Sequence, residues 1–290
     1  MENIKRLPAL AKLKVEKTRA RWGWFDVVIR TFKRFGEDDG GSYAAALTYY
    51  TFFSIFPLLL FFVAAVGYLT FGNDVLQEKL IDSGLKTVPI LKDALTPEGI
   101  EIIQKRRGSL VLTGFVLALY SGSGVIVALQ HALNRIQHEA DEPSFIQKRL
   151  RSLMWLGVLG TGAVGSLALS TLAGFAPGPV ALVLALAGGL ALNSALFATS
   201  FKFLPAKSRS WREVLPGSIV AAIGFEILKV AGTTYLARGD AMRSDTFGTF
   251  AAAAALLIAS YLIAQVVLLS AEVNEVLAER RATRQSMIAA

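Results

Sequence analysis

Two ionisable residues inside an apolar segment are the first candidates for chemistry in this sequence. Glu226 and Lys229 lie three residues apart within residues 214–236, so a helix would place them on adjacent turns of one face. Ionisable residues inside a membrane are costly and suggest a functional site. The alternatives are a mutually neutralised pair, or a lysine that extends outward while Glu226 bonds to a neighbouring helix. We expect Glu226 to face a water-filled cavity.

Amide side chains form a second group of candidates. Gln130 and Asn134 are four residues apart at the end of an apolar segment, and Gln265 lies inside the last such segment. On one helix face these amides can form hydrogen bonds to other helices, each worth about 1 kcal/mol. Packing between helices and a polar binding site are therefore both open interpretations.

Two carboxylates follow the last apolar segment. Glu272 and Glu275 are three residues apart, so a helix would place them on one face. If the helix ends here, the carboxylates oppose its dipole. Two explanations for this unfavourable placement stay open: the carboxylates have a basic partner such as Arg149 or Arg151, or the helix end is simply solvated. Convergence with the amides of the second apolar segment would allow an enzyme that acts on lipid-linked substrates.

A proline interrupts the first apolar segment. Pro57 lacks a backbone N–H, so we expect it to remove one helical hydrogen bond and kink the helix. The hydroxyl groups of Tyr49, Tyr50 and Ser54 precede it in the chain. These hydroxyls either satisfy the carbonyls that the kink frees, or line a cavity.

The composition places these residues in a membrane protein. Of 290 residues, 53% are hydrophobic and 18% are charged, whereas a soluble domain carries about 25% charged residues. The chain has no cysteine and only two histidines, which excludes disulfides, thiol catalysis and zinc sites built on cysteine. No phosphate-binding Gly-x-x-x-x-Gly-Lys-Ser/Thr motif is present. We therefore expect neither a metal ion nor a cofactor.

Apolar segments of about 20 residues or more are long enough to cross a membrane. Six of them predict an all-α fold, a polytopic bundle of six transmembrane helices: residues 43–71, 109–133, 153–175, 179–203, 214–236 and 247–269. They lack the alternation of β-barrel strands. The predicted organisation is a basic segment at 1–42, a transmembrane domain at 43–271 with an outer-face loop at 72–108, and a tail at 272–290.

The distribution of basic residues predicts the orientation. When Lys202 at the end of the fourth segment is counted with the connection that follows it, 21 lysines and arginines fall on one side and 8 on the other, so both termini are expected in the cytoplasm. The net charge of +8 then reflects orientation and not nucleic-acid binding, because the basic residues flank apolar segments.

The segment before the first span has its own pattern. Aromatic, aliphatic and basic residues alternate at helical spacing over residues 22–35, which predicts an amphipathic helix at the membrane interface. Its aromatic side chains would lie at headgroup depth, and its cations near anionic lipid headgroups. The alternative is a topology signal without any further role.

Five segments together resemble the YihY/BrkB family of bacterial inner-membrane proteins. They are ALTYYTFFSIFP at 46–57, GVIVALQHALN at 124–134, REVLPG at 212–217, TFGTF at 246–250 and LSAEVN at 269–274. The resemblance covers residues 25–282, and Ser270 stands where the family often has glycine. It implies a six-helix protein of the bacterial inner membrane, described as a transporter or a virulence factor. The family has also carried a ribonuclease label, which the residues do not support.

The leading functional hypothesis is a transporter or lipid-handling permease. It rests on Glu226 and Lys229, on the expected kink, and on a cationic rim suited to anionic headgroups or solutes. The alternative is a non-transporting scaffold for an envelope complex, and an enzyme is a third hypothesis. Membrane lipids are the expected partners and nucleic acid is not. A homo-oligomer or an envelope partner stays open.

Overall fold

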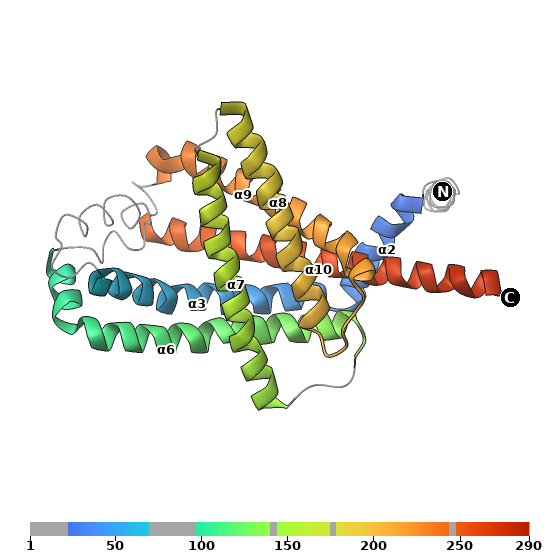
Figure 1. Cartoon of the computed structure of the whole chain (residues 1–290), viewed down its shortest axis with the longest axis horizontal. Helices are drawn as coiled ribbons and strands as arrows, with labels where there is room; N and C mark the ends of the chain where they lie inside the picture. Colours follow the sequence, from blue (N-terminus) through green and yellow to red (C-terminus); the bar gives the residue numbers. More distant parts are fainter. Residues whose placement is uncertain (1–22, 70–96, 140–143, 175–177, 244–247, 290) are drawn as a thin grey trace, which may run out of the picture.

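The computed structural model describes residues 23–69, 97–139, 144–174, 178–243 and 248–289. All regular structure in these ranges is helical (Figure 1). The helices are α2 (Gly23–Glu37), α3 (Gly40–Leu69), α6 (Pro97–Ile136), α7 (Phe145–Gly174), α8 (Gly178–Phe203), α9 (Trp211–Arg243) and α10 (Gly248–Ala289). The predicted all-α class therefore holds for the part of the chain that the structure describes.

Each of the six predicted apolar segments overlaps one of the helices α3 and α6 to α10. Within the described ranges, four stretches are long and apolar enough to cross a membrane: Gly40–Phe61, Gly108–Ile136, Trp211–Gly232 and Ala253–Ile288. These stretches support a membrane location. That α7 and α8 also cross the membrane stays a prediction.

Two helix boundaries differ from the predicted ones. Helix α6 begins at Pro97, well inside the predicted outer-face loop, because proline suits the first position of a helix. Residues 72–96 of that loop, and residues 1–22 of the basic segment, lie outside the described ranges.

Helix α10 continues to Ala289, since its polar end is rich in Ala, Glu, Leu and Arg. The expectation that a helix ends near Glu272 is wrong, so the end of a helix dipole does not act on these carboxylates.

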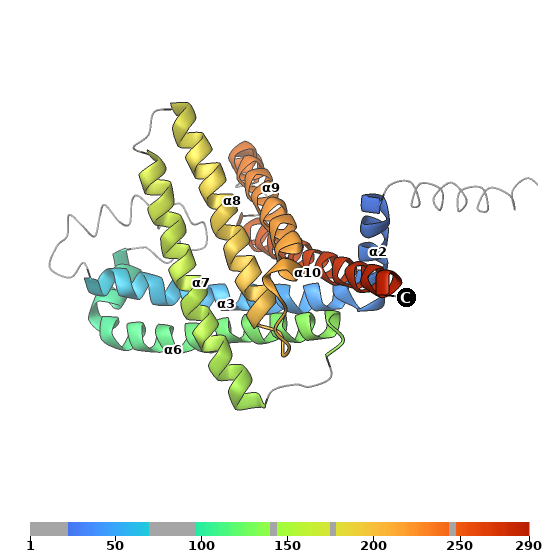
Figure 2. The ribbon, with the colours of Figure 1, turned by 45° about the vertical axis from the view of Figure 1, so that its right-hand side comes forward.

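Helices α3 and α6 run antiparallel and side by side in both views, and α10 contacts both of them (Figures 1 and 2). Helices α7 and α8 cross α3 and α6 at steep angles, whereas α9 packs against α10. Gly114 of α6 allows the close approach of α3, because a Cβ there would lie 2.9 Å from the backbone of Phe61. By contrast, a Cβ at Gly157 or Gly165 of α7 would have nothing within 4 Å, so these two glycines mark no close helix contact within the described residues.

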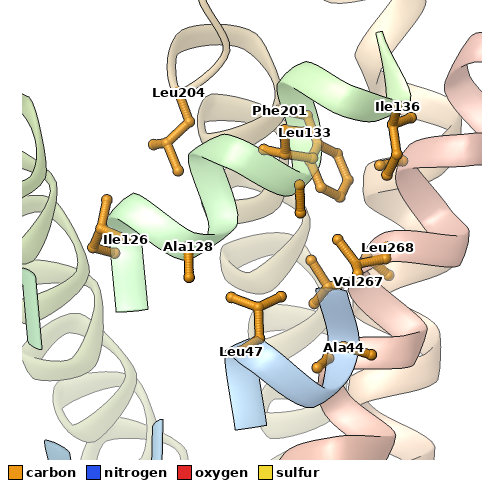
Figure 3. Close-up of a cluster of buried hydrophobic side chains, with 14 of the residues drawn as sticks. Ala44, Leu47, Ile126, Ala128, Leu133, Ile136, Phe201, Leu204, Val267 and Leu268 are labelled. Carbon is orange, nitrogen blue, oxygen red and sulfur yellow. The ribbon is translucent and has the colours of Figure 1, made fainter. Parts of the chain in front are cut away.

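The apolar core lies where α3, α6, α8 and α10 meet (Figure 3). Its fully buried side chains include Leu133 of α6, Leu204 just after α8 and Leu268 of α10. Many large apolar residues elsewhere, such as Tyr120 and Ile227, are exposed on the outside of the bundle. This distribution suits a protein that is surrounded by lipid, where an apolar outer surface carries no cost.

Candidate functional site

Buried polar residues gather at one end of the bundle. Helix α2, the start of α3, the end of α6, the connection between α8 and α9, and the middle of α10 all contribute to this end. We call the following residues the polar cluster: Asp38, Gln130, Asn134, Glu272, Asn274 and Glu275, each at most 9% exposed. Burying so many polar groups is costly unless they have partners.

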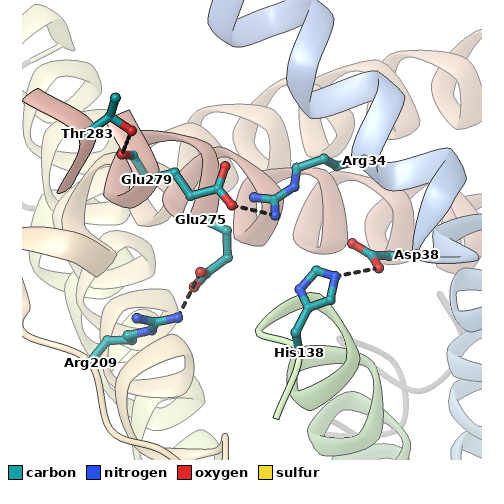
Figure 4. A network of polar contacts seen from close by, with 7 residues as sticks. All are labelled: Arg34, Asp38, His138, Arg209, Glu275, Glu279 and Thr283. Atoms are coloured by element: carbon teal, nitrogen blue, oxygen red, sulfur yellow. Dashed lines mark hydrogen bonds and ion pairs between the residues drawn. The ribbon is translucent and has the colours of Figure 1, made fainter. Parts of the chain in front are cut away.

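Contacts between titratable groups connect separate helices around this cluster (Figure 4). The distances are 2.8 Å from Arg209 Nη2 to Glu275 Oε2, 2.7 Å from Arg34 Nη2 to Glu279 Oε1, and 3.3 Å from His138 Nε2 to Asp38 Oδ1. The pair of Arg209 and Glu275 is the most buried of the three, with side-chain exposures of 23% and 11%. The three contacts hold the elements of this end together.

The basic partner of the α10 carboxylates is therefore Arg209, from the connection between α8 and α9. Arg149 and Arg151, which the sequence suggested as partners of these carboxylates, make other contacts. The guanidinium of Arg149 lies 4.3 Å from the centre of the Tyr120 ring, and Arg151 donates to the carbonyl oxygen of Pro205 at 3.5 Å. The partner comes from a different connection because α7 crosses α6 and lies away from this part of α10.

Glu272 is the most unusual member of the polar cluster. Its side chain is completely buried, and neither carboxylate oxygen has a hydrogen-bond partner among the described residues. The side-chain nitrogens of Gln130 and Asn134 are also buried without partners, although Asn134 Oδ1 accepts from the backbone N–H of Ala206 at 2.8 Å. Each such atom costs about 1–3 kcal/mol. Native proteins contain few such atoms, and a bound water, an ion or a functional role is the usual explanation for one.

The space beside the cluster is small. A cavity of about 10 Å³ lies between α6, α8, α9 and α10 and is lined by Gln137, Arg209 and Glu275, among others. This volume is enough for about one water molecule. This cavity is therefore too small for a lipid-linked substrate in the described conformation. Within the described ranges, no group of three acidic or histidine residues is placed to hold a metal ion.

Glu226 and Lys229 form a direct ion pair on α9, with 2.5 Å between Nζ and Oε2. The second carboxylate oxygen of Glu226 accepts a hydrogen bond from Asn193 Nδ2 of α8 at 2.9 Å. The Glu226 side chain is 14% exposed and that of Lys229 is 50% exposed. This is the geometry of the paired alternative, and the expectation of a water-filled cavity stays a prediction.

The candidates on α3 do not join the cluster. Tyr49 and Tyr50 are 59% and 44% exposed on the outside of the helix. Ser54 Oγ donates to the carbonyl oxygen of Thr51 at 2.8 Å, and Pro57 lies within the helix. Gln265 is partly buried on α10, about two turns before Glu272.

Two hydrogen bonds join α9 to α10 at a contact that our reading of the sequence did not predict. Pro216 has no N–H for the carbonyl of Arg212, and Arg281 Nη1 donates to that carbonyl oxygen at 2.8 Å. Next to the proline, the N–H of Gly217 donates to Asn274 Oδ1 at 2.7 Å. The signal in the sequence was the pair of segments at 212–217 and 269–274, which meet here in space.

Comparison with known proteins places the chain in a family. A family profile described as "Virulence factor BrkB" matches residues 31–289. The inner membrane protein YhjD of Escherichia coli is 26% identical, over 93% of this chain and 82% of that protein. The ribonuclease-like protein YfkH of Bacillus subtilis is 26% identical, over 86% of this chain and 94% of that protein. A UPF0761 membrane protein of Chromohalobacter salexigens is 26% identical, over 89% of this chain and 65% of that protein.

No solved structure matches. This chain belongs to the BrkB family of membrane proteins.

Proposed function

We propose that this protein is a transporter or lipid-handling permease, and that the polar cluster closes its cytoplasmic end. The observation that carries the proposal is Glu272, a completely buried carboxylate without a hydrogen-bond partner among the described residues. In membrane proteins, ionisable residues that face the interior of a bundle mark the pathways of ions and substrates.

The surroundings of Glu272 suit an element with two conformations. Arg34 and Asp38 lie close enough to act on its charge, and both belong to contacts that join separate helices. The contacts of Arg34 with Glu279 and of His138 with Asp38 each include a half-exposed side chain, and breaking such pairs costs little. A shift of α2 relative to α10 would then let water or a solute reach Glu272.

A second polar site lies deeper along the proposed path. Glu226 and Lys229 of α9, with Asn193 of α8, are about four turns beyond the start of α9 at Trp211. Because Lys229 is half-exposed, its cation can reach an anionic solute or headgroup while Glu226 holds its position. This site supports anions or anionic lipids as the substrate class.

Reconstitution into liposomes tests the proposal. The purified protein is assayed with fluorescent phospholipids and with a panel of labelled anions, against empty vesicles. We expect flux for at least one class, and we expect Glu272→Gln to reduce it strongly without loss of assembly. The matched control is Glu37→Gln, because Glu37 is exposed and pairs with Lys33 outside the cluster. Absence of flux above empty vesicles for every class would refute transport.

The scaffold hypothesis has one observation in its favour. Trp24, Val28 and Phe32 of α2 are 62%, 42% and 61% exposed, and they follow each other at every fourth residue. They form an apolar stripe on the face of α2 that points away from the bundle. This stripe suits an amphipathic helix on the inner leaflet, or a docking helix for an envelope protein. Crosslinking in cells that captures a stoichiometric partner, with Glu226 and Lys229 replaceable by Gln and Met, would favour the scaffold.

A further inference from the structure

An open groove lies between the start of α9 and the last part of α10. It has a volume of about 860 Å³ and is separate from the polar cluster and from Glu226. Its lining includes Arg212, Leu215 and Ile219 of α9, and Ala278, Arg281 and Ala282 of α10. The groove combines two cations with apolar side chains and one carboxylate, that of Glu213.

The apolar part of the groove continues along α9. Leu215 and Ile219 are 44% and 45% exposed, and Ile223 and Ile227 extend the same line with exposures of 44% and 62%. Residues four apart lie above one another on a helix, so these side chains form one stripe. The stripe belongs to the stretch Trp211–Gly232, which is apolar enough to cross a membrane. It therefore provides a surface for an acyl chain.

The charged part of the groove lies at the end of this stripe. Arg212 and Arg281 are both exposed, and no carboxylate among the described residues pairs with either guanidinium. The bond from Arg281 to the Arg212 carbonyl uses only Nη1, so it orients the guanidinium and leaves its other N–H groups available. The carboxylate of Glu213 accepts a hydrogen bond from the backbone N–H of Ser210 at 3.0 Å. This bond holds the negative charge of Glu213 at the start of α9.

A neighbouring aromatic residue fixes the depth of the groove in a membrane. Trp211 is 47% exposed, and Lys202 Nζ lies 5.1 Å from the centre of its ring. Tryptophan and lysine at the end of an apolar span are typical of the headgroup region. We therefore expect the two arginines at the level of the lipid phosphates, and the stripe from Leu215 to Ile227 at the level of the acyl chains.

We propose that the α9–α10 groove binds one anionic phospholipid, with its phosphate between Arg212 and Arg281 and an acyl chain along the stripe from Leu215 to Ile227. Guanidinium groups bind phosphate oxygens through paired, charge-assisted hydrogen bonds. The inference goes beyond the proposed transport function, because a bound lipid at this groove needs no movement across the membrane.

Native mass spectrometry of the full-length protein, released from nanodiscs of phosphatidylcholine and phosphatidylglycerol, tests this proposal. We expect the wild type to retain phosphatidylglycerol in preference to phosphatidylcholine. The double variant Arg212→Gln/Arg281→Gln should lose this preference by roughly thirty-fold, because each cation near an anionic headgroup contributes about 1 kcal/mol. The matched control is Arg284→Gln, which removes an exposed arginine of α10 outside the groove and should retain the lipid.

Two further variants test whether the groove itself holds the lipid. Ala282→Trp fills the groove without a change of charge and should also release the lipid, while Arg212→Gln alone leaves the bond from Arg281 to the backbone intact and should lose about five-fold. Retention by the double variant, or equal loss in the Arg284 control, would overturn the proposal. Displacement of the lipid by soluble glycerol phosphate at equal concentration would also overturn it, because the groove would then recognise phosphate alone. Because no flux is measured, failure here leaves the transport assay unaffected.

Discussion

At the scale of single residues, the ion pair in α9 is asymmetric. Glu226 is mostly buried and is bound by Lys229 and Asn193, whereas half of the Lys229 side chain is exposed. Lys229 can therefore keep its charge in contact with the surroundings when its partner is lost. Glu226 has no such freedom, because its carboxylate lies against α8 close to Gly189.

The two single substitutions should therefore differ in thermal melts in detergent. Lys229→Met leaves a buried carboxylate with Asn193 alone and should cost about 1–3 kcal/mol. Glu226→Gln places an amide against Asn193, and its loss of stability should be smaller than that of Lys229→Met. The double variant should melt close to the wild type, because a buried pair can be replaced as a unit.

The same melts test the cavity expectation. If Glu226 faced a water-filled cavity, both single variants would melt like the wild type and the double variant would be no more stable than either. Equal melting temperatures for all four proteins would therefore favour a solvated site over the pair that the structure describes.

At the scale of helices, the contact between α9 and α10 depends on a glycine. A Cβ at Gly217 would overlap the carbonyl oxygen of Ser270 and lie 2.6 Å from the side chain of Asn274. Backbone atoms cannot move away as the end of a flexible side chain can. The bond from the Gly217 N–H to Asn274 fixes the same contact, so α9 and α10 have little freedom to separate.

Gly217→Ala should destabilise the protein by about 1–3 kcal/mol, because overpacking forces the two backbones apart. The control is Gly157→Ala on α7, where nothing lies within 4 Å of the added methyl group; its stability should rise slightly, since alanine favours a helix. Detergent melts compare the two variants. Equal melting temperatures would show that the α9–α10 contact tolerates a methyl group.

Helix α2 is held against α10 by a small number of polar contacts. Arg280 donates to the carbonyl of Gly23 at 2.7 Å and pairs with Asp26 at 2.8 Å. Arg280→Gln should loosen the start of α2, and hydrogen exchange of the α2 amides should become faster while that of α3 is unchanged. Arg284→Gln is the control, because Arg284 is exposed outside this contact. Unchanged exchange in α2 would mean that other contacts hold the helix.

At the scale of the whole molecule, the ion pairs are strongly segregated. Within the described ranges, each pair except that of Glu226 and Lys229 uses residues before α3, at or just after the end of α6, between α8 and α9, or in the second half of α10. These are the connections that the distribution of basic residues assigns to one side of a membrane. The fold brings them to one end of the bundle, as that orientation requires.

The orientation can be tested with single cysteines, because the chain has none of its own. A maleimide that cannot cross membranes should label Gly178→Cys in intact spheroplasts, since the start of α8 lies on the predicted outer side. Ser286→Cys, near the end of α10, should react only after the membrane is permeabilised. Labelling of Ser286→Cys in intact spheroplasts would contradict cytoplasmic termini.

The sequence alone determined the helical class, the membrane location and the family. A run of about 20 apolar residues has one stable form in lipid, because a helix satisfies its own backbone hydrogen bonds. That requirement is local, so the segments around residues 109–133 and 214–236 could be placed within helices before any contact was known. Helix ends were less certain, as α10 beyond Glu272 illustrates, because a polar helix leaving the bundle carries no hydropathy signal.

Only the tertiary structure decided which polar groups meet. Glu275 pairs with Arg209 and not with the arginines beside α7, and Glu272 is buried while Tyr49 is exposed. Such outcomes depend on how helices cross and how closely glycines such as Gly217 let them approach. These are properties of side-chain packing between residues far apart in the chain, and hydrophobic periodicity within one helix contains no information about them.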